Sequence, residues 1–365
     1  MARIDLVGVG KTLRDAGGRR GMSFAIEDVT LRIPNGRTMV VLGPSGCGKT
    51  TLLKLIAGLM APDTGVVRYD DVDVADVPPG ERRIGMVFQG YALYPHMTSR
   101  TNVLSYFLFR RKTPELNALA RAKYERTSEL MGVELAQLLD RKPATLSGGE
   151  KQRVALGRCI TRDARLFLVD EPFANLDQAL REKYRVNLKI LLRQFEITTV
   201  YVTHDHHEAL ILADLVAVMN RGRIEQIGTP QAIYDEPRNV FVAGFLNLHT
   251  GSPPISLLEP SCLPAGQAPT DALVGVRPED VAVSMTERGG AVAGIVTAVL
   301  RMPPLDTMLV TVRLGEHDVH ARVASGEAIE RGDRAWLAFK RHHLFDKASG
   351  ARLTDRPPVA AGDRR

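Results

Sequence analysis

Short apolar runs broken by turn residues set the pattern of the first part of the chain. The run 38–42 (TMVVL) follows a turn at 34–36 (PNG) and predicts a buried strand. A glycine-rich loop comes next, and Gly58 and Pro62 predict the end of the helix that follows it. The apolar residues of that helix fall at helical spacing: Leu52, Leu55, Ile56 and Leu59. The order strand, loop, helix is the start of an α/β unit.

The middle of the chain alternates between helical and strand patterns. Residues 110–146 predict helix, which Thr113, Pro114 and Glu115 begin as cap, first-turn proline and first-turn acid. Three apolar residues extend this pattern: Leu135, Leu138 and Leu139. The runs 166–169 (LFLV) and 198–202 (TTVYV) predict two buried parallel strands, with a helix at 178–195 between them.

The pattern changes after Phe245. Residues 251–270 hold five of the 21 prolines, which predicts a linker or an irregular crossover. Beyond them, residues 308–314 alternate with period two, as in a strand, and the neighbouring segments are equally short. We therefore expect a small, barrel-like β-domain, ending in a frayed tail (RPPVAAGDRR).

Composition and charge bound the class of protein. A length of 365 residues favours two domains, and the net charge of +6 weakly favours polyanionic ligands such as nucleotides. The three cysteines are far apart, so we expect a reducing compartment and neither a disulfide framework nor a zinc site. The sequence shows no signal-peptide core and no apolar run that could span a bilayer, so we expect any membrane role to go through partners.

Residues 43–50 match the phosphate-loop pattern G-x-x-x-x-G-K-[ST] between the predicted strand and helix. Glycines let backbone N–H groups surround a phosphate chain, and the helix N-terminus adds positive potential. Lys49 would neutralise the β- and γ-phosphates, and the Thr50 hydroxyl would bind Mg²⁺. A glycine-rich turn with a chance lysine is the alternative, which the flanking elements disfavour. The candidate nucleotide-binding residues here are Gly43, Pro44, Ser45, Gly46, Cys47, Gly48, Lys49, Thr50 and Thr51.

Asp170 and Glu171 end the second apolar run. A carboxylate at the C-terminal end of a strand can hold the Mg²⁺ shell, and a second one beside it can polarise water. An acidic helix N-terminus is the common alternative for such a pair. The nearby phosphate loop favours the nucleotide-site interpretation.

Residues 146–150 (LSGGE) support two compatible interpretations. Ser147 and Glu150 form the S-x-x-E capping box of a helix start. The box does not require Gly148 and Gly149, which expose the N–H groups of that helix end to an anion.

Together these motifs resemble the ATP-binding cassette (ABC) ATPases. In family order they are the Walker A loop at 43–50, the glutamine-loop residue Gln89, the signature at 146–150, Walker B at 166–170 followed by Glu171, the D-loop at 174–177 and the switch histidine His204. Residues 87–98 are similar to the ATPases of bacterial sugar and glycerol-derivative importers of the maltose-importer type. The segments 227–230, 241–245, 276–280 and 344–346 resemble the same subfamily.

This resemblance implies an α/β P-loop NTPase fold, an ABC cassette with a helical subdomain, followed by an all-β, oligonucleotide-fold-like domain of the TOBE/MOP type. We expect the cassette at residues 1–237, with its helical subdomain at about 90–160. The C-terminal regulatory domain would cover 238–365, with a flexible tail from about 355.

The family also implies roles for single residues, with ATP and Mg²⁺ as cofactors. Glu171 would be the general base, His204 would contact the γ-phosphate, and Lys49 would hold the phosphates. Asp177 of the D-loop would belong to the nucleotide site, and Mg²⁺ would be held by Thr50, Gln89 and Asp170. Two cassettes would face head to tail, so that Ser147, Gly148 and Gly149 of one complete the ATP site of the other.

The implied partners are a second ATPase cassette, identical or different, and two integral membrane permeases, to which Gln89 would link the site. An extracytoplasmic solute-binding protein would act indirectly, and no nucleic acid is implied. The chain would be peripheral, at the cytoplasmic face of the cell membrane, and would drive uptake of a carbohydrate, polyol or glycerol-phosphate-type solute. The alternatives are a regulatory or weakly catalytic cassette paired with a second ATPase, or an importer of another solute class.

Several positions depart from the family pattern. The family stacks adenine on an aromatic residue where this chain has Leu13, followed by insert-like residues 14–20, and Phe24 is a candidate substitute. Gly90 and Ala174 stand where serine is usual or frequent. Residues 99–102 (SRTN) lack the acid that commonly precedes the asparagine, at a place where the family meets its membrane subunits.

Two further patterns have a structural interpretation. His204 and Glu208 have the spacing of helical metal ligands, but they follow a strand and lack the H-E-x-x-H order, so a switch followed by a helix start is favoured. Four basic residues recur every fourth position on the helix at 178–195, where we expect a solvated basic face: Arg181, Arg185, Lys189 and Arg193. A cassette that acts on DNA or ribosomes would need a long coiled-coil insertion or a second cassette, which this sequence lacks.

Overall fold

The computed structural model describes most of the chain and divides it into two compact units, Met1–Pro230 and Gln231–Arg365. The described residues are 2–13, 24–108, 110, 113–131, 137–162, 164–173, 178–247, 253–264, 268–302 and 305–353. None of the helices in this described part combines the length and the hydropathy needed to cross a bilayer.

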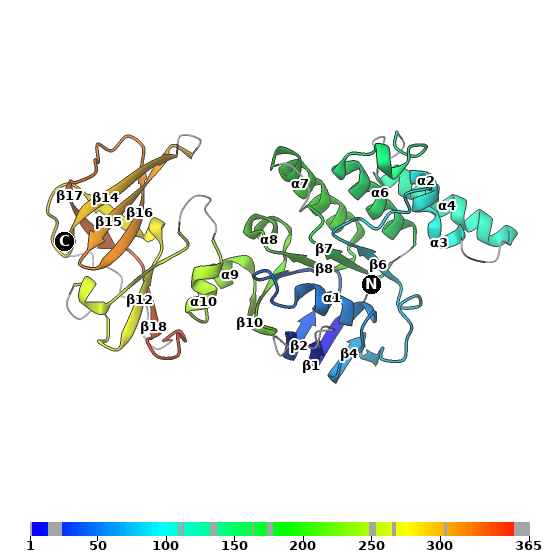
Figure 1. The fold of residues 1–365 in the computed structure, drawn as a ribbon, viewed down its shortest axis with the longest axis horizontal. Coiled ribbons are helices and arrows are strands. Elements are labelled where there is room, and N and C mark those ends of the chain that lie inside the picture. Colours follow the sequence, from blue (N-terminus) through cyan, green and yellow to red (C-terminus); the bar gives the residue numbers. More distant parts are fainter. Residues whose placement is uncertain are drawn as a thin grey trace, which may run out of the picture. The chain divides into compact units, whose positions relative to one another are not determined.

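A six-stranded, mainly parallel sheet forms the centre of the first unit (Figure 1). Its spatial order is β10 (Arg223–Gly228), β9 (Leu215–Asn220), β3 (Thr38–Leu42), β8 (Thr198–Thr203), β7 (Leu166–Asp170) and β6 (Ile84–Val87), with only β10 antiparallel to its neighbour. Every residue of β3, β7 and β8 is buried, because structure covers both faces of the sheet. These strands confirm the three buried runs predicted from the sequence.

A second, antiparallel sheet lies below the first in Figure 1, with α1 (Lys49–Ala57) enclosed between them. Its order is β2 (Phe24–Ile33), β1 (Ile4–Leu13), β4 (Thr64–Tyr69) and β5 (Val72–Asp73). Apolar residues from both sheets and from α1 form one core. Gly58 caps α1 in the left-handed conformation, as the sequence predicts, but Leu59 lies beyond the helix and is exposed.

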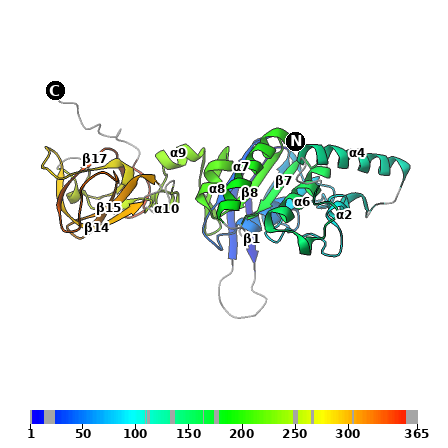
Figure 2. The same ribbon diagram turned by 90° about the horizontal axis from the view of Figure 1, so that it is seen from above.

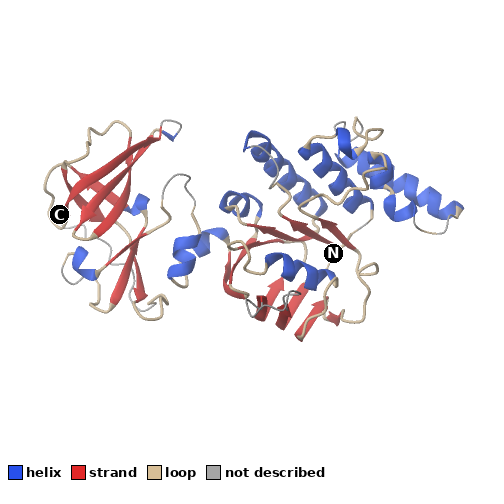
Figure 3. Ribbon diagram, in the orientation of Figure 1, coloured by secondary structure: helices blue, strands red, loops and turns tan. Residues whose placement is uncertain are grey.

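Three helices cover the opposite face of the parallel sheet (Figures 1 and 3): α6 (Gly148–Thr161), α7 (Gln178–Phe195) and α8 (His206–Leu212). The helices α2 (Ser99–Val103), α3 (Ser105–Leu108) and α4 (Pro114–Met131) lie beside the sheet, where α2 and α4 pack against α6. The start predicted for α4 is confirmed, since the Thr113 hydroxyl accepts a hydrogen bond of 3.1 Å from the Leu116 N–H. The predicted continuation to residue 146 is wrong: Leu138 and Leu139 lie in a turn before the 3₁₀ helix η1 (Pro143–Thr145), and Leu135 falls outside the described residues. Leu138 and Leu139 are buried because the turn packs them against Val103 and Val154.

The second unit is mainly β-structure, after the short helices α9 (Pro230–Asp235) and α10 (Val240–Phe245). A five-stranded antiparallel sheet has the order β13 (Val281–Ser284), β17 (Arg334–Phe339), β14 (Val292–Met302), β15 (Thr307–Leu314) and β16 (His317–Ala324). Its end strands β13 and β16 also contact each other, so the sheet curls into the barrel-like form that Figure 2 shows.

Three shorter strands form a second sheet in this unit: β11 (Ser256–Leu258), β12 (Ala272–Val276) and β18 (His343–Asp346). The proline-rich segment at 251–270 contributes only the edge strand β11 and the 3₁₀ helix η2 (Pro260–Cys262) to the described structure. A third 3₁₀ turn, η3 (Pro278–Asp280), precedes β13. Alternate residues of the strands fill the core, which bears out the period-two pattern at 308–314.

Candidate nucleotide site

The loop between β3 and α1 is shaped for close approach to its backbone. Gly46 and Gly48 have φ of 79° and 109°, a left-handed region that favours glycine. A Cβ at Gly43 would lie 2.3 Å from the Met219 carbonyl oxygen, so this position also requires glycine. Gly48 is the N-cap of α1, which places the positive end of the helix at the loop.

Lys49 is buried and its ammonium lies against the loop. Its Nζ donates hydrogen bonds to the carbonyl oxygens of Gly43 and Pro44, at 2.8 and 3.0 Å. A cavity of about 300 Å³ opens beside it, lined by Ser45, Gly46, Gly48, Lys49, Thr50, Thr51, Gln89, Asp170 and Glu171. The fold thus brings together in one cavity most of the residues predicted from separate motifs. Gln89 reaches it from the exposed segment that follows β6.

Thr50 and Asp170 meet at the edge of this cavity. The Thr50 hydroxyl donates to Asp170 Oδ1 at 3.1 Å, across 120 positions of sequence. Burial raises the pKa of the Asp170 carboxyl, the Thr50 hydrogen bond opposes the rise, and the negative charge of Glu171 adds to it. The hydroxyl and carboxylate oxygens are the ligand types that Mg²⁺ prefers.

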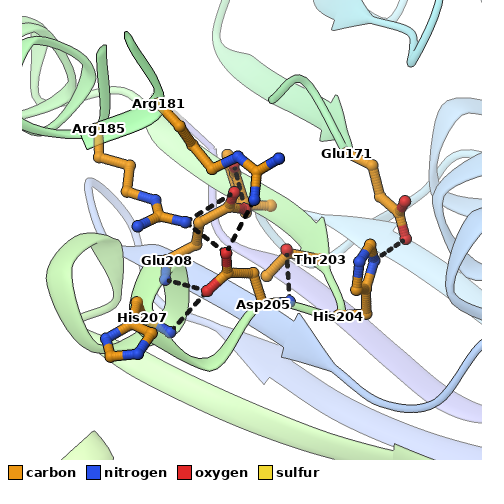
Figure 4. Close-up of polar contacts among 9 residues, drawn as sticks. Glu171, Arg181, Arg185, Thr203, His204, Asp205, His207 and Glu208 are labelled. Carbon is orange, nitrogen blue, oxygen red and sulfur yellow. Dashed lines mark hydrogen bonds and ion pairs between the residues drawn. The ribbon is translucent and has the colours of Figure 1, made fainter. Parts of the chain in front are cut away.

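Glu171 and His204 face each other at the C-terminal ends of neighbouring parallel strands (Figure 4). His204 Nδ1 lies 3.1 Å from Glu171 Oε1. Glu171 has φ of 41°, and its N–H donates to the Val202 carbonyl oxygen at 3.0 Å. The carboxylate is therefore aimed by the turn that ends β7 and lines the same cavity as Lys49.

The signature residues lie elsewhere, at the start of α6. Ser147 is the N-cap, and both hydrogen bonds of the predicted capping box are present: Ser147 Oγ accepts from the Glu150 N–H, and Glu150 Oε2 accepts from the Ser147 N–H at 2.7 Å. The hydrogen bond from the Ser147 backbone lowers the pKa of Glu150. Among the described residues, those that line the phosphate-loop cavity include neither Ser147 nor the two glycines. Residues 174–177, with Asp177, lie outside the described part of the chain.

The described residues include some of the positions that depart from the family pattern. Leu13 ends β1 and is half-buried, whereas residues 14–20 and the side chain of Phe24 are outside the described residues. Asn102 is fully buried, and its amide nitrogen donates to the carbonyl oxygens of Tyr94, Met97 and Thr98. Its amide therefore shapes the loop before α2.

The basic stripe on α7 is not the solvated face predicted from the sequence. The Arg185 side chain is only 7% exposed and pairs with Asp205 and Glu208, and Lys189 Nζ donates to the Leu212 carbonyl oxygen at 2.6 Å. Arg193 is exposed, as predicted. Arg185 and Lys189 face α8, where their long side chains reach a carboxylate and a backbone carbonyl oxygen.

Asp205, Glu208 and Tyr201 make contacts near the site that the sequence did not indicate. Asp205 is the N-cap of α8, and Glu208 accepts a hydrogen bond of 2.8 Å from the buried Tyr201 hydroxyl. The described residues hold no cluster of three or more acidic, histidine or cysteine side chains with metal-site geometry. The helix start predicted after His204 is confirmed, since Asp205 caps α8.

Comparison with known proteins gives consistent matches. A family model described as ABC transporter matches residues 26–174, and one described as TOBE domain matches residues 274–345. The chain is 39% identical to the trehalose/maltose import ATP-binding protein MalK of Thermococcus litoralis, over 96% of this chain and 99% of that protein. It is 40% identical to the sn-glycerol-3-phosphate import ATP-binding protein UgpC 2 of Rhizobium johnstonii, with the same coverage of 96% and 99%.

A solved structure shares the fold of the first unit. It is a dimeric ATP-binding cassette in a post-hydrolysis state, bound to ADP and Pi, with a TM-score of 0.51 and 29% identity. The match covers 62% of this chain and 98% of that one.

Proposed function

The chain belongs to the ABC transporter family, among its import ATP-binding proteins, and from this premise we propose how its residues couple ATP to solute uptake. It is the ATP-hydrolysing subunit of an importer for a carbohydrate, polyol or glycerol-phosphate-type solute. The relatives that are 39–40% identical import trehalose/maltose and sn-glycerol-3-phosphate, which supports this solute class.

The observation that carries the proposal is the convergence of Lys49, Thr50, Asp170 and Glu171 on one cavity. The N–H groups of the loop and the Lys49 ammonium would hold the β- and γ-phosphates of ATP. The oxygens of Thr50, Asp170 and Gln89 suit a hard divalent cation, so these three residues would hold Mg²⁺. When bound, Mg²⁺ supplies positive charge that stabilises the phosphate oxygens during transfer.

Glu171 is the proposed general base. Its carboxylate would accept a proton from the water that attacks the γ-phosphate. His204, whose Nδ1 lies 3.1 Å from Glu171 Oε1, would orient this carboxylate and contact the γ-phosphate through its other ring nitrogen, Nε2. Both roles depend on the turn after β7 and on the segment after β8.

A second cassette would complete the site. Ser147, Gly148 and Gly149 lie at the N-terminus of α6, where the N–H groups of the two glycines and the Ser147 hydroxyl would bind phosphate of a nucleotide held by another copy. Asp177 would join the site at the same interface. The dimeric arrangement of the solved cassette with ADP and Pi supports this assembly.

The membrane partners would be two permeases, contacted through the surface next to Gln89. Phe88, the residue before Gln89, lines a cavity of about 510 Å³. Tyr94, Tyr106 and Arg158 line the same cavity. We assign this surface to the permeases and propose that the chain lies at the cytoplasmic face of the membrane. The solute-binding protein acts on the opposite side, without direct contact.

Reconstitution tests this function. The chain and the permeases encoded beside its gene, placed in proteoliposomes with a solute-binding protein, should take up a labelled sugar, polyol or glycerol phosphate only with ATP. ATP turnover by the isolated chain at saturating ATP separates a full ATPase from the weakly catalytic alternative, which the unusual Leu13 position motivates. If the chain hydrolyses ATP fully but none of these solutes is taken up, the result would contradict the proposed solute class and leave the ATPase role standing.

A further inference from the structure

Arg185 lies in the middle of α7 with its guanidinium buried between two carboxylates (Figure 4). Its Nη2 donates to Asp205 Oδ2 and lies 3.7 Å from Glu208 Oε1. The side chains of Arg185 and Glu208 are 7% and 5% exposed. A buried charge is tolerated only with its partners in place, so this group has one favoured arrangement.

Asp205 divides its two carboxylate oxygens between α7 and α8. Oδ1 accepts hydrogen bonds from the N–H groups of His207 and Glu208, at 2.8 and 3.3 Å, and so caps α8. Oδ2 accepts from Arg185, with Arg181 Nη1 at 3.8 Å. The Asp205 carboxylate thus links Arg185 of α7 to the first turn of α8, directly after His204.

The chain on the other side of His204 is tied to the same group. The Thr203 hydroxyl accepts from the Asp205 N–H at 2.9 Å, and Tyr201 donates to Glu208 Oε2 at 2.8 Å. A small cavity of about 70 Å³ lies between these residues and the reacting pair, lined in part by Glu171, His204 and Asp205. The buried cluster thus borders the catalytic contact directly.

We propose that Arg185 is a positioning residue for ATP hydrolysis: by holding Asp205 and Glu208, it fixes the backbone at His204 and keeps the imidazole against Glu171. This inference rests on the proposed roles of Glu171 and His204 in hydrolysis. Among the described residues, those that line the phosphate-loop cavity do not include Arg185, so we place it outside the reacting groups.

Crystal structures of full-length variants test the geometry without any reference to turnover. In Arg185→Ala we expect the His204 Nδ1 to Glu171 Oε1 separation to exceed hydrogen-bonding distance. Asp205→Asn is the second variant, because asparagine keeps the cap of α8 but loses the charge that Arg185 binds. An unchanged contact of 3.1 Å in both variants would overturn the proposal.

Kinetics test the consequence for hydrolysis. We expect Arg185→Ala to lower kcat by about 10- to 100-fold, with the KM for ATP within about twofold of wild type, because displacement of a catalytic group by an ångström has this effect. Arg185→Lys should recover part of the loss, since lysine keeps the charge but not the planar fork. Arg193→Ala, an exposed position on the same helix, is the matched control and should leave kcat unchanged.

A double mutant separates positioning from a general structural role. If Arg185 acts through His204, adding Arg185→Ala to His204→Ala should change kcat by less than about twofold, because residues that act as a unit are non-additive. An undiminished effect in that background contradicts the proposal. A wild-type chain without ATP turnover would instead contradict the proposed function. The distance from His204 Nδ1 to Glu171 Oε1 in the variant structures would then decide the role of Arg185.

Discussion

The Thr50 hydroxyl donates to Asp170 Oδ1 at 3.1 Å, which joins the first turn of α1 to the end of β7. The contact connects the phosphate loop to the carboxylate-bearing strand, although 120 positions separate the two residues in the sequence. Asp170 is buried at this contact, and burial raises the pKa of its carboxyl, whereas the Thr50 hydrogen bond opposes the rise.

Asp170→Asn should therefore stabilise the protein while it removes Mg²⁺-dependent hydrolysis. A carboxyl with a raised folded-state pKa binds protons more tightly in the folded state, so its contribution to stability falls as pH rises through the interval between the unfolded and folded pKa values. The neutral amide avoids this loss. Urea unfolding at pH 7 without Mg²⁺ should show a higher free energy of unfolding than wild type, and an equal or lower value would contradict the argument.

Glu171→Gln should lower ATP turnover by about 10²- to 10⁴-fold, the usual contribution of a positioned general base. ATP binding should persist, because the phosphate contacts of Lys49 and the loop are untouched. Phosphate release and nucleotide affinity measured on the same preparation check both parts. Glu182→Gln, at an exposed position of α7, is the matched control, and near-normal turnover in Glu171→Gln would remove Glu171 from the role of base.

Lys49→Ala should weaken ATP binding by about 10- to 100-fold, because hydrogen bonds to a charged group contribute about 1.5–3 kcal/mol. Lys54→Ala is the control, since Lys54 is an exposed lysine in the same helix. Fluorescent-nucleotide titration measures both affinities. Equal affinities in the two variants would show that Lys49 does not hold the phosphates.

Two substitutions at Ser147 separate helix capping from phosphate binding. Ser147→Ala should lower the free energy of unfolding by about 1 kcal/mol, the typical effect of a lost N-cap. Ser147→Asp keeps a capping oxygen and should keep stability, but it places a negative charge where phosphate would bind. We expect both variants to lose hydrolysis, and wild-type turnover in Ser147→Asp would exclude the phosphate contact.

The β-structured unit should lose stability in mild acid through His343. Burial lowers the pKa of His343 to about 4, and the charge of Arg277 contributes to this shift. The unfolded chain therefore binds a proton that the folded chain does not, and stability falls as pH drops from about 6.5 toward about 4. The slope from one proton is about 1.4 kcal/mol per pH unit at most. His343→Gln should flatten the pH dependence of unfolding in this window, and an unchanged slope would assign it to other groups.

Local signals made the core of the cassette predictable. The strands β3, β7 and β8 coincide with contiguous apolar runs, because a strand buried on both faces needs apolar residues at every position. The phosphate loop was equally visible, since its glycines meet steric demands within eight residues. The meeting of Thr50, Asp170 and Glu171 could be expected from the rule that parallel strands end at the same edge.

The features that sequence reasoning missed depend on distant partners. The spacing of Arg181, Arg185 and Lys189 indicates a basic stripe on α7. Only the fold shows that Glu208 of α8 and Asp205, the N-cap of α8, lie against this stripe. Leu138 and Leu139 fit the helical spacing from Leu135, yet they belong to a small core whose other buried members are Val103 of α2, Val154 of α6 and Leu146 before α6. In both cases periodicity identified a face without identifying what covers it.

The left-handed backbone of Glu171, with φ of 41°, has a consequence for how this protein can evolve. A glutamate in this conformation is strained by about 1–3 kcal/mol, whereas glycine or asparagine adopts it readily. A gene copy released from selection for turnover would therefore drift toward Gly or Asn at position 171, since each exchange improves folding. Folding stability and the proposed role as general base thus set opposite demands on position 171.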